Sequence, residues 1–254
     1  MTRDHVDTAA QAWMTSAAML AEVQPGGFHR VGAHGTSELV TGAPMPFLNG
    51  VISIRREADV EEVAAFAASP RLKAVAWSIQ VRNERAADQI ASTVAHHGFG
   101  QTMALPFMIK ELSERDTEVP VADPVVRRVS GAEGDLYQRV MAAGYEGPVE
   151  IFAIFSSPAV MDHPSMRAYI AEVDGVPVAT SFGVLVDDLV GVFNVAVPPS
   201  SRRRGYGRVA TAAVLREAYA AGARTAFLHA SPLGVPLYQD MGFRIAENWR
   251  IFTG

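Results

Sequence analysis

Cysteine is absent from the 254 residues of the chain. This absence excludes disulfides, thiolate metal ligands and a cysteine nucleophile, and it fits a reducing compartment. Lysine occurs only at Lys73 and Lys110, so the Gly-x-x-x-x-Gly-Lys-Ser/Thr loop of nucleoside triphosphate-binding proteins is missing. No apolar run approaches about 18 residues, and the polar start of the chain lacks the features of a signal peptide. We therefore expect a cytoplasmic protein without a membrane-spanning segment.

The composition is that of a globular protein that can bury a sizeable core, with 49% hydrophobic and 19% charged residues. A net charge of −5 argues against general nucleic-acid binding. No metal site is expected, because the adjacent His96 and His97 would point in different directions on a helix. The length suits one large domain or two of ordinary size, in a monomer or a homodimer.

The most informative stretch combines a strand, a basic loop and a helix. A β-branched run, Val190–Val197, ends at two prolines, whose missing N–H groups stop sheet pairing. A basic turn with two glycines follows. The alanine-rich segment Ala210–Ala221 predicts a helix, and Gly222 stands where its C-terminal stop belongs.

This geometry suits a phosphate group, because the first turn of a helix has N–H groups without intrahelical partners and a dipole that favours negative charge. Gly205 and Gly207 remove side chains that would keep an anion away. Four arginines could grip phosphate oxygens in pairs. They are Arg202, Arg203, Arg204 and Arg208. The alternative is a solvated basic turn before an ordinary surface helix.

The segment Gly205–Ala210 also fits the looser Gly-x-Gly-x-x-Gly/Ala pattern of dinucleotide-binding folds. However, seven residues separate Val197 from Gly205, whereas that fold turns directly out of its strand. No acidic residue ends the next expected strand, Thr225–Ala230, and too few residues follow for the rest of such a domain. A nicotinamide-dependent oxidoreductase is therefore disfavoured.

Two segments together resemble a known family. The turn Arg202–Gly207 resembles the Arg/Gln-x-x-Gly-x-Gly/Ala signature of the GNAT superfamily of N-acetyltransferases, which also follows a strand and opens a helix. The segment Leu237–Phe243 resembles the family's Leu-Tyr-x-x-x-Gly-Phe sequence. The resemblance covers about Val125–Phe252. Ser231 and Gly234 depart from it, since the family often has Asn and Ala there, and a cofactor contact at Ser231 is put in doubt.

The resemblance implies transfer of an acetyl group from acetyl-coenzyme A, without a metal, to the primary amine of a small molecule or peptide. The pyrophosphate would lie on the N–H groups of the basic turn. The pantetheine arm would run along the strand edge like an added strand, where a backbone N–H could hold the thioester oxygen. The implied cofactor-binding residues are Val195, Ala196, Val197, Arg202, Arg203, Arg204, Gly205, Tyr206, Gly207, Arg208 and Ser231.

By the same resemblance, Tyr238 would face the leaving sulfur. A phenol has a pKa near 10 and a thiol about 8.5, so we expect a hydrogen bond to the developing thiolate, with proton delivery only if the site shifts these values. With no cysteine available, direct attack by the amine is favoured. The candidates for a general base, by position only, are Glu150, Glu172, Asp188 and His229. A non-catalytic sensor that binds acyl-coenzyme A is the alternative function.

The predicted fold is α/β with a mixed sheet, the GNAT fold. Helices are expected at 7–23, 60–68, 84–96, 131–143, 210–221 and 236–241, with a linker at 112–124 and a short helix or buried loop at 149–155. Strands are expected at 28–31, 38–41, 47–54, 74–81, 101–109, 125–129, 167–173, 176–184, 189–197, 225–230 and 244–252.

An internal repeat is also indicated. Gly98-Phe99 aligns with Gly242-Phe243 (242 − 98 = 144), and Leu48-Asn49 aligns with Phe193-Asn194 at nearly the same offset. The position matching the glycine turn, 56–60, has no glycine, and Val94 matches Tyr238. We therefore predict a degenerate GNAT-like domain at 1–115 and a catalytic domain at 116–254.

Overall fold

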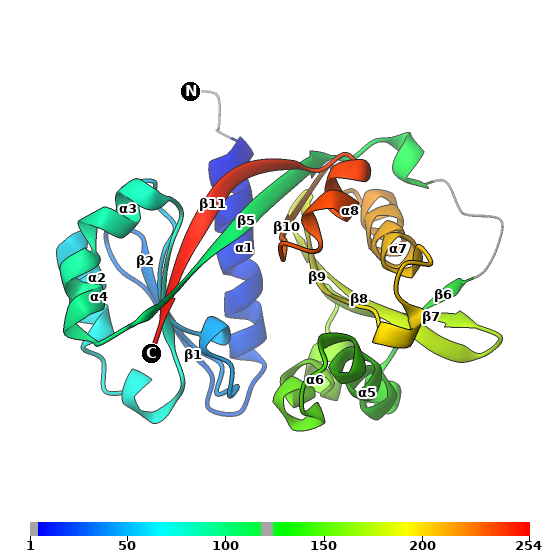
Figure 1. Cartoon of the computed structure of the whole chain (residues 1–254), viewed down its shortest axis with the longest axis horizontal. Coiled ribbons are helices and arrows are strands. Elements are labelled where there is room, and N and C mark those ends of the chain that lie inside the picture. The colour runs from blue at the N-terminus through cyan, green and yellow to red at the C-terminus, as the bar shows by residue number, and fades with distance from the viewer. Residues whose placement is uncertain (1–4, 118–123) are drawn as a thin grey trace. The chain divides into compact units, whose positions relative to one another are not determined.

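The computed structural model describes residues 5–117 and 124–254. The chain forms two compact units, each with β-strands and packed helices (Figure 1). The first unit extends to Met108 and includes residues 229–235 and 244–254. The second unit comprises residues 109–228 and 236–243.

The first unit has the strand order β1-β2-β3-β4-β11-β5. Its strands are β1 (Phe28–Val31), β2 (Thr36–Val40), β3 (Asn49–Ser53), β4 (Ser78–Val81), β5 (Gln101–Glu111) and β11 (Arg244–Thr253). Its helices are α1 (His5–Glu22), α2 (Val60–Ala67), α3 (Glu84–Gln89) and α4 (Ala91–His96), with 3-10 turns η1 (Pro46–Leu48) and η2 (Leu72–Ala74). Strands β3 and β4 pair in parallel, because α2 carries the chain across between them.

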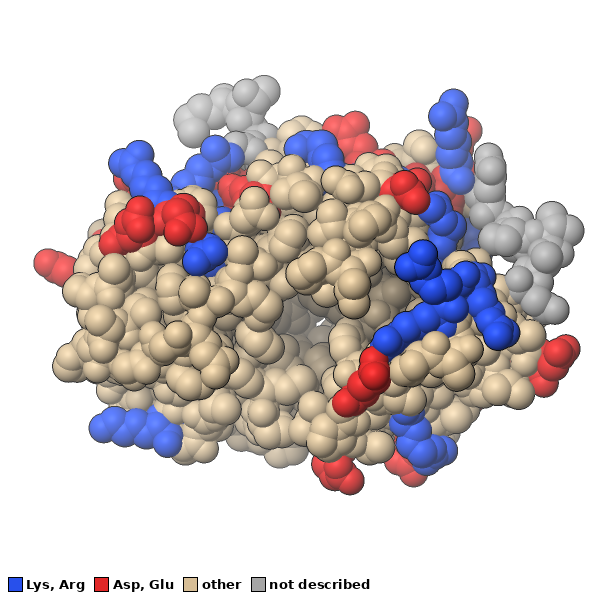
Figure 2. Space-filling model, in the orientation of Figure 1, with Lys and Arg blue, Asp and Glu red and all other residues tan. Residues whose placement is uncertain are grey.

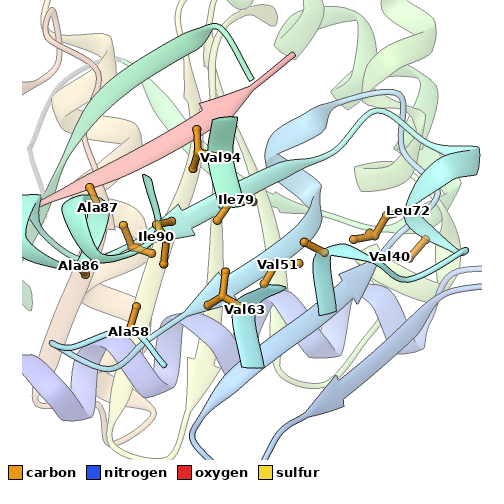
Figure 3. Packing of buried hydrophobic residues seen from close by; sticks show 12 residues of the cluster. Val40, Val51, Ala58, Val63, Leu72, Ile79, Ala86, Ala87, Ile90 and Val94 are labelled. Atoms are coloured by element: carbon orange, nitrogen blue, oxygen red, sulfur yellow. The ribbon is translucent and has the colours of Figure 1, made fainter. Parts of the chain in front are cut away.

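The core of the first unit lies between α2–α4 and the sheet. Figure 3 shows Val63 of α2, Ile90 beside α4 and Val51 of β3 gathered in one apolar layer. All three are fully buried. An isolated helix of six to eight residues is unstable in water, so α2, α3 and α4 depend on packing their apolar side chains against the sheet.

The second unit has the strand order β10-β9-β8-β7-β6. Its strands are β6 (Val125–Val129), β7 (Met166–Val173), β8 (Val176–Val186), β9 (Leu189–Ala196) and β10 (Thr225–His229). Its helices are α5 (Gly134–Tyr145), α6 (Pro158–Met161), α7 (Tyr206–Ala220) and α8 (Val235–Asp240). The 3-10 turns are η3 (Glu114–Thr117), η4 (Gly131–Glu133), η5 (Val149–Phe155) and η6 (Pro199–Ser201).

Helices cover both faces of this second sheet, with α5 and α7 on opposite sides (Figure 1). The hydroxyl of Ser181 in β8 donates to the carbonyl of Ala210 in α7 at 2.8 Å. The buried Tyr137 hydroxyl of α5 donates to the carbonyl of Ser181 at 3.3 Å. Strands β6–β9 pair antiparallel and β10 pairs parallel to β9, so the predicted mixed α/β sheet is confirmed.

Several predicted elements have different limits. The helix expected at 84–96 is two helices, because Ile90 leaves the helical conformation. The strand expected at 74–81 begins at Ser78, since η2 occupies Leu72–Ala74. The helix expected from Ala210 begins four residues earlier, at Tyr206. In the expected linker 112–124, η3 forms a 3-10 turn, and 118–123 lie outside the described residues.

The compact units are not the contiguous segments 1–115 and 116–254, because β11 pairs with β4 in the first unit. The sequence-based domain boundary itself stays a prediction. Across the described ranges, no helix has the length and hydrophobicity needed to cross a membrane. The same ranges contain no cluster of three or more potential metal-ligating side chains.

The guanidinium of Arg82 joins three segments of the first unit. Arg82 directly follows β4, and its side chain is almost completely buried. It donates two hydrogen bonds to the Glu247 carboxylate of β11 at 2.6 and 2.7 Å. A third goes to the Asp7 carboxylate of α1 at 2.5 Å. Burial alone would raise the pKa of Asp7, but Arg82 and Arg56 lower it overall. The bidentate geometry makes Arg82 a strong side-chain link between β11, α1 and the end of β4.

Removing one partner of this buried pair leaves a guanidinium short of hydrogen-bond acceptors. We expect Glu247→Ala to destabilise the first unit by about 3 kcal/mol. Tryptophan fluorescence during urea unfolding reports this unit, because all three tryptophans, at positions 13, 77 and 249, lie in it. The exposed Glu61→Ala variant is the control. Equal midpoints for the two variants would contradict the prediction.

Candidate active site

Strands β9 and β10 pair over only part of their length. The parallel register runs from Leu189 to Gly191 in β9 and from Thr225 to Phe227 in β10. Strand β9 then continues to Ala196 without a strand partner on that side within the described residues. The backbone edge from 192 to 196 is therefore open to an extended ligand.

Two aromatic rings explain why the strands part. The Phe193 ring packs over Gly191, where an added Cβ would lie 2.4 Å from it, and Phe227 of β10 lies 2.9 Å from the same point. The rings of Phe193 and Phe227 meet edge to face with centroids 6.2 Å apart. Only glycine at position 191 leaves room for this pair beside the backbone.

On the opposite side of β9 from the open edge, a β-bulge interrupts the pairing with β8. Thr180 faces Ala196 and Phe182 faces Phe193, so two residues of β9 lie opposite Ser181 alone. Asn194, the first of the two, has a left-handed φ of 50°. The Thr180 hydroxyl holds the bulge by donating to the Asn194 carbonyl at 2.9 Å. A bulge leaves a ladder group unpaired, and this one lies next to the predicted residues Val195 and Ala196.

The helix after β9 begins without a capping side chain. Gly205 is its N-cap residue, has a left-handed φ of 83° and offers no acceptor to the first-turn N–H groups. Gly207 faces Leu237 of α8, where an added Cβ would lie 3.4 Å from the side chain. Figure 2 shows Lys and Arg side chains gathered on the surface by this turn. The helix start thus combines free N–H groups with local positive charge, as predicted.

The four arginines of the turn are not equivalent. Arg202 donates to the Val197 carbonyl at 3.1 Å, to the Gly144 carbonyl at 2.9 Å and to the Glu146 carboxylate at 2.6 Å. Its guanidinium is thus engaged within the protein, and its contact with a phosphate stays a prediction. Arg208 lies 3.6 Å from the Asp240 carboxylate. Among the described residues Arg203 and Arg204 form no ion pair, so they are the better phosphate donors.

The end of α5 packs directly on the end of β9. An added Cβ at Gly144 would lie 2.7 Å from the Ala196 side chain and 2.8 Å from the Val197 nitrogen. Together with the bond from Arg202 to the Val197 carbonyl, this contact occupies the last of the three predicted edge residues. Ala196 is buried under the same contact, so Val195 is the predicted edge residue that α5 leaves partly exposed.

Tyr238 lies in α8, and the Gly242-Phe243 pair that follows this helix contacts it. Gly242 ends the helix with a φ of 88°, and the Phe243 nitrogen donates to the Tyr238 carbonyl at 2.9 Å. The buried Phe243 ring meets the Tyr238 ring edge to face at 5.8 Å. Lys110, which is paired with Asp116, donates to the Met241 carbonyl at 2.7 Å. These contacts explain the spacing Tyr-x-x-x-Gly-Phe as a helix with a fixed C-terminal turn.

Tyr238 has a protonated hydroxyl over a wide pH range. Burial, followed by the proximity of Tyr145, raises the pKa of Tyr238 well above its ordinary value. Its side chain makes no hydrogen bond to another described residue, which leaves the hydroxyl available to a ligand.

Tyr145 is a site residue that the sequence analysis missed. It is 50% exposed, yet the surrounding protein raises the pKa of its hydroxyl to about 12. Its ring stacks on Phe152 at 5.4 Å, and it acts electrostatically on Tyr238. No sequence motif marks Tyr145.

The candidate bases differ in their surroundings. Glu172 is paired with Arg127 at 2.9 Å, which favours its interpretation as a surface residue. His229, in the first unit, lies among the rings of Trp13, Phe107 and Trp249, and burial lowers its pKa to about 3. Glu150 is exposed, and the Asp188 carbonyl accepts from Arg224. No candidate is marked out as the base by its contacts.

Ser231 has only local contacts. Its hydroxyl accepts from the Gly234 nitrogen at 3.2 Å, within the loop that leads into α8. The role predicted for Ser231 in cofactor binding stays a prediction.

The corresponding helix of the first unit has the opposite chemistry. The Asp59 side chain caps α2 by accepting from the Glu62 nitrogen at 2.9 Å. The Glu62 carboxylate in turn accepts from the nitrogens of His34 and Thr36 at 2.9 and 2.8 Å. Two carboxylates thus satisfy this helix start and the adjacent hairpin, which makes it a poor site for a phosphate.

A comparison with protein families decides the nature of the second unit. A model of the acetyltransferase (GNAT) family matches residues 136–243. Residues 136–243 are a GNAT acetyltransferase domain. The match ends at Phe243 and includes the basic turn, α7 and Tyr238. A comparison with curated proteins found no match.

The GNAT fold extends over both units. A GCN5-related N-acetyltransferase from Kribbella flavida is 20% identical with a TM-score of 0.69, over 99% of this chain and 96% of that one. A conserved protein of unknown function from Staphylococcus epidermidis is 13% identical with a TM-score of 0.67, over 89% and 94%. A GCN5-related N-acetyltransferase from Sphaerobacter thermophilus is 15% identical with a TM-score of 0.52, over 77% and 66%. At these identities the likeness shows the fold.

The engagement of Arg202 gives a testable difference among the arginines. Because two of its three hydrogen bonds join the turn to the C-terminal end of α5, we expect Arg202→Ala to lower the free energy of unfolding by about 1 kcal/mol, a modest value since the pair is partly exposed. Arg204→Ala, which removes no such bond, should leave it unchanged. Urea unfolding followed by circular dichroism measures both. A larger loss for Arg204→Ala would refute the assignment.

Proposed function

We propose that the protein is an acetyl-coenzyme A-dependent N-acetyltransferase that acts on a primary amine. The observation that carries the proposal is the open edge of β9 beside the uncapped start of α7. A strand edge can pair with an extended amide-containing arm, and a free helix N-terminus can hold a pyrophosphate. Coenzyme A contains both groups, and the family match supports this choice of ligand.

The local residues fit this ligand. The left-handed Gly205 points no side chain toward the first-turn N–H groups, and no heavy atom lies within 4 Å of an added Cβ there. Arg203 and Arg204 supply charge beside the turn. In the GNAT domain Val195 lies on the part of β9 that no strand pairs with on that side among the described residues. The first unit has carboxylates at its helix start, so we expect one cofactor site per chain.

The bound thioester would supply an activated acetyl group. An unpaired backbone N–H at the Asn194–Val195 bulge would stabilise negative charge on the acyl oxygen as the amine attacks. Tyr238 would donate its hydroxyl proton in a hydrogen bond to the leaving sulfur. Its raised pKa keeps the proton on the oxygen in the resting site and favours hydrogen bonding over full transfer.

The amine acceptor would bind on the α5 side of the site. Tyr145 and Phe152 form a stacked aromatic wall there. An acceptor amine must lose a proton before attack, and Glu150 or a water chain could accept it. A sensor that binds acyl-coenzyme A without catalysis is the second candidate. The free Tyr238 hydroxyl favours the enzyme, because binding alone would not need it.

We also propose that the two units arose by duplication. Gly98 and Gly242 both have left-handed φ, 68° and 88°. The Phe99 nitrogen donates to the Val94 carbonyl as the Phe243 nitrogen does to that of Tyr238, which supports the alignment of Val94 with Tyr238. The structural match between the aligned residues Asn49 and Asn194 is weaker, because Asn49 begins β3 whereas Asn194 lies near the end of β9.

Calorimetric titration tests the cofactor. We expect acetyl-coenzyme A to bind wild type at one site, and NADH not to bind. Gly205→Glu should abolish binding, because a carboxylate would repel the pyrophosphate. Gly222→Glu at the other end of α7 is the matched control, since it is also a left-handed glycine with no heavy atom within 4 Å. Two sites, or binding by Gly205→Glu, would contradict the proposal.

Turnover tests Tyr238. Once a primary amine is found by screening for thiol release, Tyr238→Phe should cut turnover roughly 10²–10⁴-fold if the hydroxyl delivers a proton. Because the pKa of Tyr238 is raised, wild type should keep this donor above pH 10. Tyr219→Phe, whose ring lies under Arg224, is the control. If the chemical step limits turnover and Tyr238→Phe turns over as fast as wild type, Tyr238 takes no part in the mechanism.

A further inference from the structure

The first unit contains a cavity of about 610 Å³ that the proposed acyl transfer does not use. Residues from the C-terminal part of α2, from α4 and from η2 line it, and it is open to solvent on one side. Small side chains of α2, Ala64, Ala67 and Ala68, line one side and leave its interior open. A volume of this size is in the range of small-molecule sites rather than of a single buried water.

Aromatic rings form the opposite wall. Trp77 meets Phe99 edge to face at 4.7 Å and meets His97 edge to face at 5.2 Å. All three residues line the cavity. Such a wall binds a flat apolar ring well, because ring edges and faces offer both area and complementary charge.

Polar groups without partners surround this aromatic wall. The hydroxyl of Ser69 is buried, lines the cavity and has no hydrogen-bond partner among the described residues, which is costly unless a ligand or water pairs with it. Lys73 and His96 also line the cavity, and neither forms an ion pair with any residue that the structure describes. Lys73 lies within the 3-10 turn η2, and its side chain is exposed.

We propose that this cavity binds a small planar aromatic carboxylate. The ring would lie against Trp77 and Phe99, and the carboxylate would accept hydrogen bonds from the ammonium of Lys73 and the imidazole of His96. The Ser69 hydroxyl would pair with a polar edge of the ring or with a water beside it. This site is independent of the proposed acetyl transfer, because every lining residue belongs to the first unit.

Calorimetry with 2-naphthoate as the probe tests the site. We expect one site on wild type and roughly tenfold weaker binding to Lys73→Gln, as for loss of a hydrogen bond to a charged group. Arg71→Gln is the matched control. Its guanidinium lies 3.9 Å from the Phe28 ring, outside the cavity, and its affinity should stay within about twofold of wild type. The uncharged 2-naphthylmethanol should bind Lys73→Gln and wild type equally.

A second variant tests the cavity itself. Ala64→Phe places a ring in the space from an exposed helix position, and it should abolish naphthoate binding while circular dichroism stays unchanged. No binding to wild type at millimolar probe would overturn the proposal. Equal affinity for wild type and Lys73→Gln would overturn it too, even if Ala64→Phe failed to fold. Binding lost in Gly205→Glu instead would place the probe at the arginine turn and exclude the cavity.

Discussion

The separation of β9 from β10 is the constraint on which the candidate site depends. Backbone N–H and C=O groups must pair with something, and in a continuous sheet the next strand would take them. Here the aromatic pair over Gly191 ends the pairing after three residues, and the bulge at Asn194 turns the rest of the strand away. The free α7 start and Tyr238 gain significance only because this edge is unoccupied.

The two units use one topology for different purposes. In each, an antiparallel pair is followed by a crossover helix and a parallel strand, and a Gly-Phe turn ends the next helix. The chemistry at the crossover helix differs. Glycine and arginine leave α7 open to an anion, whereas the Asp59 and Glu62 carboxylates fill the same place at α2. The first unit has instead an aromatic cavity at the other end of its helices.

Features set by neighbouring residues were predictable from the sequence. The proline stop after β9, the left-handed Gly205 and the Gly242-Phe243 turn all follow from local backbone preferences, and the motif spacing indicated the GNAT fold. Features set by contacts between distant residues were not. The bond from Arg202 to Gly144, the position of Tyr145 and the partner strand of β11 depend on tertiary packing, which the sequence around each of them does not encode.

The placement of β11 has a consequence for synthesis on the ribosome. Strand β11 is made after all the other strands of the two units, yet it pairs with β4, and its Glu247 neutralises the buried Arg82 of a segment made much earlier. Until β11 emerges, the early segment carries an unpaired sheet edge and a guanidinium with too few acceptors. The second unit can fold before the first unit has β11 to complete its sheet. Translation order and folding order are therefore reversed, and the nascent early segment is the part most exposed to aggregation.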